Sequence, residues 1–392
     1  MSANDITGLH HVGLVVHDMD AAIDTFRRLG FDIGSPAYPA LPPAPDAEPE
    51  PIGAGNTHAD FSRGFIELLA FAPEDRDQLP ADARLVPLQV PDDQLAATRT
   101  AIRGTVAALE TRLHRSEGAH ILIFSTVDAD RTAARLTSIN IGHTGARPAQ
   151  RPITTAAGTS LAPIKYLEIS DDQSGLLPEG RIGAAEDAPP ELLDAQTGLD
   201  HPNGAIGLAE GVLCVDDGDL DATADRYGMY LNRIPTGHGD MRTIELGAHR
   251  LTITTPRRFA ERLPGEAPRS SSLSAYAIEV ADLAATEELL RARGTDLRKS
   301  PAGEPFIPAD AAHGTPILLR QATPAAYRGH PSLLQLESPS PCDPRSTASA
   351  QYSSGSSERC CPGSVLSQLP PDCRLTDHFA DPSERFSHCS CS

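Results

Sequence analysis

One arrangement recurs four times along the chain: a strand-like apolar run, an acidic residue, a short amphipathic helix and a turn. The four copies occupy residues 9–33, 119–141, 211–231 and 275–297. Irregular sequence and further strand-like runs follow each copy. An internal repeat decides the fold of a chain, because a unit of this size buries its apolar face only against its neighbours. We therefore expect four modules that each begin with a strand and a helix and continue with more strands.

The acidic residues mark where the helices begin. Asp18, Asp128 and Asp282 each stand just before a stretch with helical apolar spacing, and Gly30 ends the first helix. A short polar side chain at this position accepts hydrogen bonds from the free N–H groups of the first turn. We interpret these Asp residues as helix caps and not as catalysts. The third copy is the weakest match, because its helix contains few large apolar side chains.

The strand-like runs that close the modules suggest how the chain is divided. They lie at residues 63–71, 162–170, 241–255 and 313–321. We predict an N-terminal domain over residues 1–172 with modules at 7–72 and 118–170, a linker over 173–204, a C-terminal domain over 205–325 and a tail over 326–392. The tail is rich in Ser, Pro and Cys and has no sustained period, so we expect it to be disordered.

The charge and the cysteines limit the partners and the compartment. A formal net charge of −20 repels phosphate backbones and anionic lipid, so we expect neither a nucleic-acid nor a membrane partner. No apolar run is long enough to span a bilayer, and the first residues do not resemble a signal peptide. Cys214 is the single Cys before the tail, which fits a reducing compartment. We expect a cytoplasmic protein with a small-molecule substrate, and a homodimer is left open.

A histidine and a glutamate in the first module are the leading candidates for a site. His11 lies in the opening strand, and Glu67 interrupts the apolar closing strand FIELLAF. A buried carboxylate is costly unless it is paired or binds a metal. His120 and Glu168 stand in the second copy in what look like the same two places. If the two modules pack with pseudo-twofold symmetry, two imidazoles and two carboxylates converge, a set that suits Fe(II), Mn(II), Ni(II), Co(II) or Zn(II).

Each of these residues also has a simpler explanation. Glu67 could pair with Arg63, Glu168 could pair with Lys165, and either histidine could be an ordinary strand residue. Three further residues are candidates for substrate contact, against the alternative of ordinary loop and turn roles: His58 in the GNTHAD segment, and His201 and Asn203 in DHPNGA. In the turn alternative Gly204 has a positive φ.

The sequence LHHVGLVVHDMDAA resembles the opening of vicinal oxygen chelate modules, and FIELLA is similar to the strand that carries the metal-binding Glu in that superfamily. GNTHADFSRGFIELLAF and LDHPNGAIGLAEGV also resemble its glyoxalase-like subgroup. The resemblance implies an α+β fold of tandem βαβββ modules in two U-shaped mixed sheets with flanking helices. It implies His11, Glu67, His120 and Glu168 as metal ligands. The matching positions in the C-terminal half fall near Gly211 or Val212 and near Thr252, so we expect that half to lack the metal site.

The function expected from this resemblance is that of a metal-dependent enzyme acting on a small substrate with two coordinating oxygens. The metal would stabilise charge as a Lewis acid, and Glu67 or Glu168 would be the catalytic base. Isomerase or epimerase, glyoxalase-type lyase and extradiol dioxygenase chemistry are all compatible with the fold. The alternatives are a metal-free protein that binds or sequesters a small molecule, as in bleomycin resistance, and an inactive structural paralogue.

Overall fold

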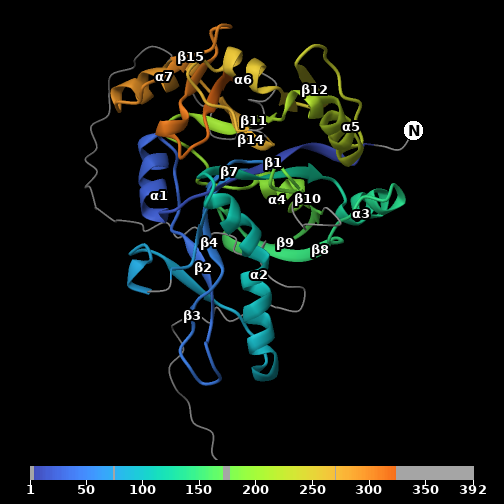
Figure 1. Ribbon diagram of the computed structural model, residues 1–392. Helices are drawn as coiled ribbons and strands as arrows, with labels where there is room; N and C mark the ends of the chain where they lie inside the picture. Colours follow the sequence, from blue (N-terminus) through green and yellow to red (C-terminus); the bar gives the residue numbers. More distant parts are fainter. Residues whose placement is uncertain (1–3, 74–75, 171–176, 270, 324–392) are drawn as a thin grey trace, which may run out of the picture.

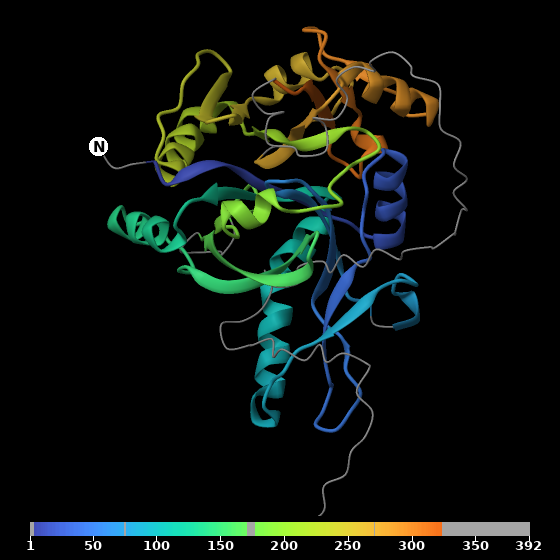
Figure 2. The same cartoon turned by 180° about the vertical axis from the view of Figure 1, so that it is seen from behind.

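The chain folds into two curled mixed sheets that lie one over the other (Figures 1 and 2). The computed structural model describes residues 4–73, 76–170, 177–269 and 271–323. Within these ranges the N-terminal sheet has ten strands and the C-terminal sheet has seven. The predicted α+β architecture of two sheets with flanking helices is confirmed. The tail predicted over 326–392 lies outside the described residues.

The first module has the predicted order of a strand, a helix and closing strands. Its elements are β1 (Ile6–Val15), α1 (Met19–Arg28), β2 (Ala37–Leu41), β3 (Glu50–Pro51), β4 (Ala54–Asp60) and β5 (Phe65–Phe71), and β6 (Arg84–Pro87) pairs with β2. The Asp18 side chain caps α1 by accepting from the Ala21 N–H at 3.0 Å. Gly30, with φ 86°, follows the helix as predicted. The last strand, β5, pairs parallel with β1 and so brings the two ends of the module side by side.

The second module closes later in the sequence than predicted. Its elements are β7 (Gly118–Thr126), α3 (Ala129–Ser138), β8 (Arg147–Thr155), β9 (Gly158–Ile169) and β10 (Arg181–Glu186), followed by α4 (Pro190–Asp194). The strand that pairs parallel with β7 is β10, whereas β9 pairs antiparallel with β10. The prediction that 162–170 closes this module is therefore wrong. The predicted linker over 173–204 is wrong in part, because it contains β10 and α4.

A long helix that the sequence analysis did not include lies between the two modules. This helix is α2 (Leu95–Leu113), and it packs onto the concave face of the N-terminal sheet. Val106, Leu109 and Leu113 are buried there with Ile121 and Ile123 of β7. Burial of a Leu or Val side chain contributes about 1.5–3 kcal/mol. The concave face of the second module is therefore covered by apolar helix side chains.

The C-terminal half repeats this plan with shorter elements. It consists of β11 (Ala205–Cys214), α5 (Leu220–Leu231), β12 (Met241–Leu246), β13 (His249–Thr254), α6 (Pro256–Arg262), β14 (Ser272–Val280), α7 (Leu283–Ala292), β15 (Arg298–Lys299), β16 (Pro305–Ile307) and β17 (Ile317–Gln321). The strands predicted over 241–255 and 313–321 are confirmed. Helix α6 covers the concave face of this sheet through Phe259 and Leu263, as α2 covers the other. Short 3-10 turns lie at Arg76–Gln78, Asp92–Gln94, Asp217–Asp219 and Ala309–Ala311.

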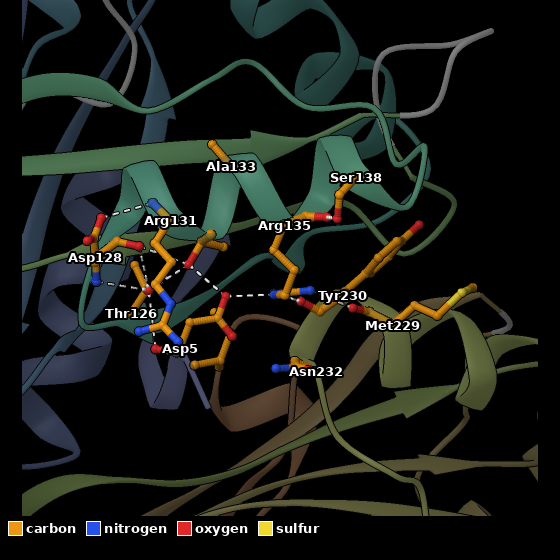
Figure 3. Close-up of polar contacts among 12 residues, drawn as sticks. Asp5, Thr126, Asp128, Arg131, Ala133, Arg135, Ser138, Met229, Tyr230 and Asn232 are labelled. Atoms are coloured by element: carbon orange, nitrogen blue, oxygen red, sulfur yellow. Dashed lines mark hydrogen bonds and ion pairs between the residues drawn. The ribbon is translucent and has the colours of Figure 1, made fainter. Parts of the chain in front are cut away.

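One apolar core joins the two sheets, and a buried ion pair stands at its edge. The core includes side chains of β1 and β7 together with side chains of β11 and β14. Arg135 of α3 donates from Nε to Asp5 at 2.7 Å and from its two terminal nitrogens to the carbonyl oxygens of Met229 and Tyr230, at the end of α5 (Figure 3). The two halves are therefore fastened to each other by polar contacts as well as by apolar ones. No helix in the described part of the chain has the length and apolarity needed to cross a membrane.

Candidate functional site

His11, His58 and Glu67 lie on the concave face of the first module. In the parallel pair of β1 and β5, His11 stands beside Phe65 and Gly13 beside Glu67. On the other side of β5, His58 of β4 stands directly opposite Glu67. Residues two apart in a strand share a face, so these side chains point the same way. The predicted candidates His11, His58 and Glu67 are thus brought together by three neighbouring strands.

The two imidazoles are stacked on opposite faces of one phenyl ring. The Phe65 ring centroid is 4.4 Å from that of His11 and 4.1 Å from that of His58, with interplanar angles of 11° and 18°. Burial lowers the pKa of both histidines, and the neighbouring His10 and Arg151 charges lower that of His11 further. Both rings are therefore neutral near pH 7. The Nε2 atom of His58 is buried without a hydrogen-bond partner among the described residues.

Glu67 is a buried acid held by a neutral donor. Its side chain accepts a hydrogen bond at 2.7 Å from the Asn56 amide, and the residue is 2% exposed. Gly13 makes room for it, because a Cβ at that position would lie 2.8 Å from the Glu67 Oε2. The alternative pairing with Arg63 is wrong, since the Arg63 guanidinium instead contacts Asp194 at 2.5 Å. A carboxylate in this setting is a candidate ligand or base in the first module.

The equivalent positions of the two modules follow from two matching irregularities. His10 in β1 and His120 in β7 are each the extra residue of a β-bulge. Gly64 and Gly180 each pass so close to the preceding opening strand that a Cβ would meet the carbonyl oxygen of His10 or His120, at 1.8 and 2.2 Å. His120 is therefore the counterpart of His10. The prediction that it corresponds to His11 is wrong by one residue.

The same register identifies the counterparts of His11 and Glu67. Residue Ile121 follows the bulge in β7 as His11 does in β1, and Gly183 of β10 stands beside Ile123 as Glu67 stands beside Gly13. Neither Ile121 nor Gly183 has a side chain that binds metal. The second module therefore lacks the donor pair that the first module has.

His120 and Glu168 have other partners. The His120 Nε2 lies 2.8 Å from the Ser116 carbonyl oxygen, and burial lowers the pKa of this histidine to about 4. Glu168 belongs to β9, where it is the counterpart of His58, and its carboxylate lies 3.4 Å from the Arg181 Nε. The alternative pairing of Glu168 with Lys165 is also wrong, because Lys165 contacts Asp130 and Glu186. The predicted base role of Glu168 has no support from its surroundings.

A divalent metal held by four protein side chains does not fit this site. The donors expected from the second module are replaced by Ile121 and Gly183, and α2 covers that part of the concave face. In the residues that the structure describes, no group of three or more His, Cys, Asp or Glu side chains is arranged to hold a metal ion. The prediction that His11, Glu67, His120 and Glu168 converge on one ion is therefore wrong, because the last two are not the equivalents of the first two.

A polar chain that the sequence analysis missed runs from the concave face to a cavity. The His10 Nδ1 lies 2.8 Å from the His11 Nδ1, and the His10 Nε2 lies 3.2 Å from Asp187 Oδ2. Arg151 donates to the same Asp187 oxygen at 3.1 Å. Burial opposes ionisation of Asp187, but His10 and Arg151 outweigh it and hold the pKa of this carboxyl well below its usual range. The adjacent histidines His10 and His11 could have indicated this polar chain in the sequence. Asp187 could not, because it follows a Gly- and Ala-rich strand with no recognisable motif.

The cavity beside this chain has room for a small molecule. It has a volume of about 1160 Å³ and is lined by His10 and Asp187, by the ends of β1, β7 and β10, and by β8 and β9. Three cationic side chains, Arg63, Arg147 and Lys165, stand in its wall. Ligand pockets combine apolar surface with a few polar groups that orient the ligand. The wall also contains Glu186 and Asp187, and Arg63 and Lys165 are paired with acids. Arg147 is therefore the cation best placed to favour a ligand that carries negative charge or several oxygens.

His201 and Asn203 hold the turn that leads into the C-terminal sheet. The His201 Nδ1 accepts from the Asp32 N–H at 3.0 Å and its Nε2 lies 3.0 Å from the Asp60 carbonyl oxygen. Asn203 donates to the Leu29 carbonyl oxygen at 2.9 Å and accepts from the Ala205 N–H at 3.0 Å. These bonds account for both side chains without a substrate. The turn alternative is supported, and Gly204 has the expected positive φ, 70°.

Comparison with known proteins extends these observations. A family model described as a glyoxalase-like domain matches residues 9–231, from β1 to the end of α5. No curated protein matches the chain. Among solved structures, a hypothetical protein from Staphylococcus aureus is similar at 10% sequence identity and a TM-score of 0.49, covering 81% of this chain and 100% of the other.

Two enzymes of known name are similar at lower scores. A mutant of 4-hydroxymandelate synthase from Streptomyces coelicolor has 15% identity and a TM-score of 0.46, covering 81% of this chain and 92% of the other. Homoprotocatechuate 2,3-dioxygenase from Brevibacterium fuscum has 12% identity and a TM-score of 0.43, covering 82% of each chain.

Proposed function

Because this chain belongs to the glyoxalase-like family of the vicinal oxygen chelate superfamily, we propose that it binds a small oxygen-bearing molecule in the N-terminal cavity and transfers a proton there. The observation that carries the proposal is the hydrogen-bonded chain of Asp187, His10 and His11 at the cavity wall. A carboxylate that holds one nitrogen of an imidazole fixes the orientation of the ring and so aims its donors. His10 is the residue proposed to exchange the proton.

The surroundings give His10 a defined donor role. The pKa of His11 is lowered well below its usual value by burial and by His10, so His11 stays neutral and its Nδ1 can accept a proton in a hydrogen bond. Asp187 stays ionised. A protonated His10 can then donate from both ring nitrogens, to His11 and to Asp187. A substrate oxygen that replaces the Asp187 oxygen at Nε2 would receive that proton, and the deprotonated His10 would recover one from solvent.

The reaction class that fits this device is an isomerisation or epimerisation through an enol. Arg63 and Arg147 in the cavity wall would hold an anionic group of the substrate. The neighbouring His10 would protonate a carbonyl oxygen as the carbon bonded to that carbonyl group loses its proton, which gives the enol. Removal of the carbon-bound proton requires a base, for which Glu186 is the cavity-lining candidate. Tyr166 also lines the cavity, but burial raises the pKa of its hydroxyl, so it is a neutral donor and not a base. Lyase chemistry of the glyoxalase type would use the same proton transfers.

Metal dependence is tested as a separate question. The remaining donors are His11 and Glu67, both in the first module. His58 stands opposite Glu67, and its Nε2 has no hydrogen-bond partner in the part of the chain that the structure describes. Elemental analysis of the full chain purified without chelator, compared with Glu67→Gln, measures whether these residues hold a metal. Stoichiometric metal in the wild type that disappears in Glu67→Gln would favour a metal-assisted form of the reaction.

The proton transfer itself is tested by isotope exchange. Pyruvate and lactate serve as simple 2-oxo and 2-hydroxy acid probes, with binding followed by ligand-observed NMR and exchange of carbon-bound hydrogen followed in D₂O. We expect His10→Asn to retain binding and to lose exchange by about a hundredfold, the usual size of a general acid–base contribution. His114→Asn, an exposed histidine at the end of α2, is the matched control. Equal exchange in His10→Asn and the wild type would refute the proposed role.

Sequestration without chemistry is the second candidate function. The loss of donors at Ile121 and Gly183 favours it, since a protein that only binds its ligand has no need of the metal set. Such a protein would bind the probes in the same cavity and would catalyse no exchange. Substitution of Arg63 and Arg147 by Gln would weaken binding under either function and locates the site.

A further inference from the structure

The concave face of the C-terminal sheet carries a charged site at the position that His11 occupies in the first module. Glu210 of β11 stands beside Arg250 of β13, as His11 stands beside Phe65. The residue before it, Ala209, is the extra residue of a β-bulge, as His10 is. The sequence pattern predicted this position at Gly211 or Val212, so an acid on the inner face of the sheet was not expected.

Glu210 is buried and strongly held by arginines. It is 1% exposed, and its two oxygens accept from the Arg262 guanidinium at 3.0 and 2.8 Å. Arg320 and the Thr252 hydroxyl donate to the same carboxylate. Burial opposes ionisation, but Arg262 and Arg320 outweigh it and lower the pKa of Glu210 to about 2. The carboxylate is therefore charged at any physiological pH and accepts hydrogen bonds from both guanidinium groups.

A second acid completes the neutralisation of these two arginines. Glu304 accepts from Arg320 Nε at 2.7 Å and from Arg262 at 3.3 Å. Two carboxylates thus balance Arg262 and Arg320. A third arginine, Arg250, is left in excess, because among the described residues its one ionic contact is at 3.9 Å from the Glu210 carboxylate. Its side chain is 43% exposed and lines a cavity, so it is accessible to a ligand.

These side chains line a cavity of about 580 Å³ between β12, β13, α6 and the segment before β16. The Thr243, Thr252 and Ser300 side chains supply hydroxyl groups, and Arg258 at the rim is paired with Glu261. The inner charges are three arginines against two glutamates, on a chain whose formal net charge is −20. A local excess of guanidinium in so acidic a protein gives this cavity a lining that suits an anionic occupant.

We propose that this cavity binds a small molecule bearing a carboxylate or phosphate group, with Arg250 as its principal contact. The planar guanidinium donates two parallel hydrogen bonds to an oxyanion. Glu210 and Glu304 already balance Arg262 and Arg320 behind it, so the positive charge that faces the ligand is that of Arg250. The Thr243 and Ser300 hydroxyls lie within the same cavity and contact the rest of the ligand. This site is separate from the N-terminal cavity, so it stands whether or not His10 transfers a proton.

Calorimetric titration of the full chain with inorganic phosphate and with acetate, at low ionic strength, tests the site. We expect saturable binding of at least one probe, and a loss of about tenfold or more in affinity in Arg250→Gln. Arg257→Gln is the matched control, because Arg257 is exposed on α6, pairs with Asp240 and is not one of the residues that line the cavity. Stronger binding of phosphate than acetate assigns a phosphate ligand, and the reverse order assigns a carboxylate.

Three results would overturn the proposal: no saturable binding of either probe by the wild type, equal loss in Arg250→Gln and Arg257→Gln, or unchanged affinity in Arg250→Gln. The first would make the arginines a purely structural ion network. Circular dichroism and thermal unfolding of both variants check that each is folded, which we expect because both side chains are substantially exposed. Arg250→Lys keeps the charge without the planar pair of donors and should fall between the wild type and Arg250→Gln.

Discussion

Replacement of Arg135 by Ala tests whether the two halves of the chain are one folding unit. Arg135 extends from α3 in the N-terminal half and bonds to Asp5 and to the last carbonyl groups of α5 in the C-terminal half (Figure 3). Its side chain is 15% exposed and that of Asp5 is 2% exposed. Thr132 also donates to the Asp5 carboxylate, at 3.1 Å. The substitution would leave a buried charge and two helix-end carbonyls without their donor.

The expected cost follows from the burial of the pair. Removal of one partner from a buried ion pair costs about 3–5 kcal/mol, because the other charge stays uncompensated. For a chain of this size one kcal/mol corresponds to roughly 2 °C, so the Tm should fall by about 6–10 °C. Arg135→Lys keeps the charge but cannot reach three acceptors at once, so we expect an intermediate loss.

Thermal and urea unfolding followed by circular dichroism measure this loss. Lys165→Met is the control, because Lys165 forms an exposed ion pair with Asp130 and should show no measurable change. A change in Arg135→Ala no larger than that of the control would refute the reasoning that the pair is buried and uncompensated when broken. Loss of the single transition, with the halves unfolding separately, would show that Arg135 couples them.

The dependence of stability on pH in the acid range tests the pair of Asp5 and Arg135 independently. Burial opposes ionisation of Asp5, but the hydrogen bond and charge of Arg135 outweigh it and the pKa lies below the usual value of 3.8. A carboxyl whose folded pKa is lowered stabilises the protein above its unfolded pKa and loses that contribution as pH falls through the folded pKa. Asp5→Asn should therefore lower stability near pH 7 and flatten its decline below about pH 4.

Three further perturbations test other parts of the fold. Leu109→Ala on α2 should cost about 2–5 kcal/mol in urea unfolding because it empties a buried position, and Leu109→Met should cost far less. The hydrogen bond between Glu117 and His313 raises the pKa of His313 and lowers the pKa of Glu117. Their pair therefore stabilises the protein most between about pH 4.5 and 6.5, the ordinary pKa values of the two groups, and weakens at lower and higher pH. Glu117→Gln should remove this maximum from a plot of Tm against pH. Gly64→Ala places a Cβ 1.8 Å from the His10 carbonyl oxygen at a positive φ, so soluble expression or Tm should fall sharply, whereas an unchanged Tm would contradict the close strand approach.

The fold was largely predictable because the residues that begin and end its helices act through local hydrogen bonds. Asp18, Asp128 and Asp282 each cap a helix through one hydrogen bond three residues ahead, and such a bond depends on neighbouring sequence alone. The repeat of these caps at similar intervals is what predicts the modules. Helix α2 was missed although Val106, Leu109 and Leu113 have helical spacing, because its apolar face is narrow and interrupted by polar residues.

The site was predictable only in the first module, because the second depends on strand register. Strand β10 reads RIGAAE, a weak strand sequence that is stabilised by pairing with β7 on one side and β9 on the other. Glu168 lies in the more strand-like β9 and so was taken for the closing acid. A bulge of one residue then separates His120 from the position of His11. Register shifts of this kind change which face a side chain occupies, and they are fixed by tertiary pairing.

The helices α2 and α6 each join one module to the next and pack on the concave face of a sheet. The residues that build the sheets are therefore separate from the residues that cover them. Strand pairing holds the sheets together, while each joining helix covers part of a concave face and so sets how much of that face is open to a ligand. Residues of α6 line the C-terminal cavity, whereas the lining of the N-terminal cavity contains no residue of either helix. Insertions or deletions in α6 would therefore change the first of these cavities and leave the second as it is. The two cavities can therefore change independently of each other, although the strands around them follow the same plan.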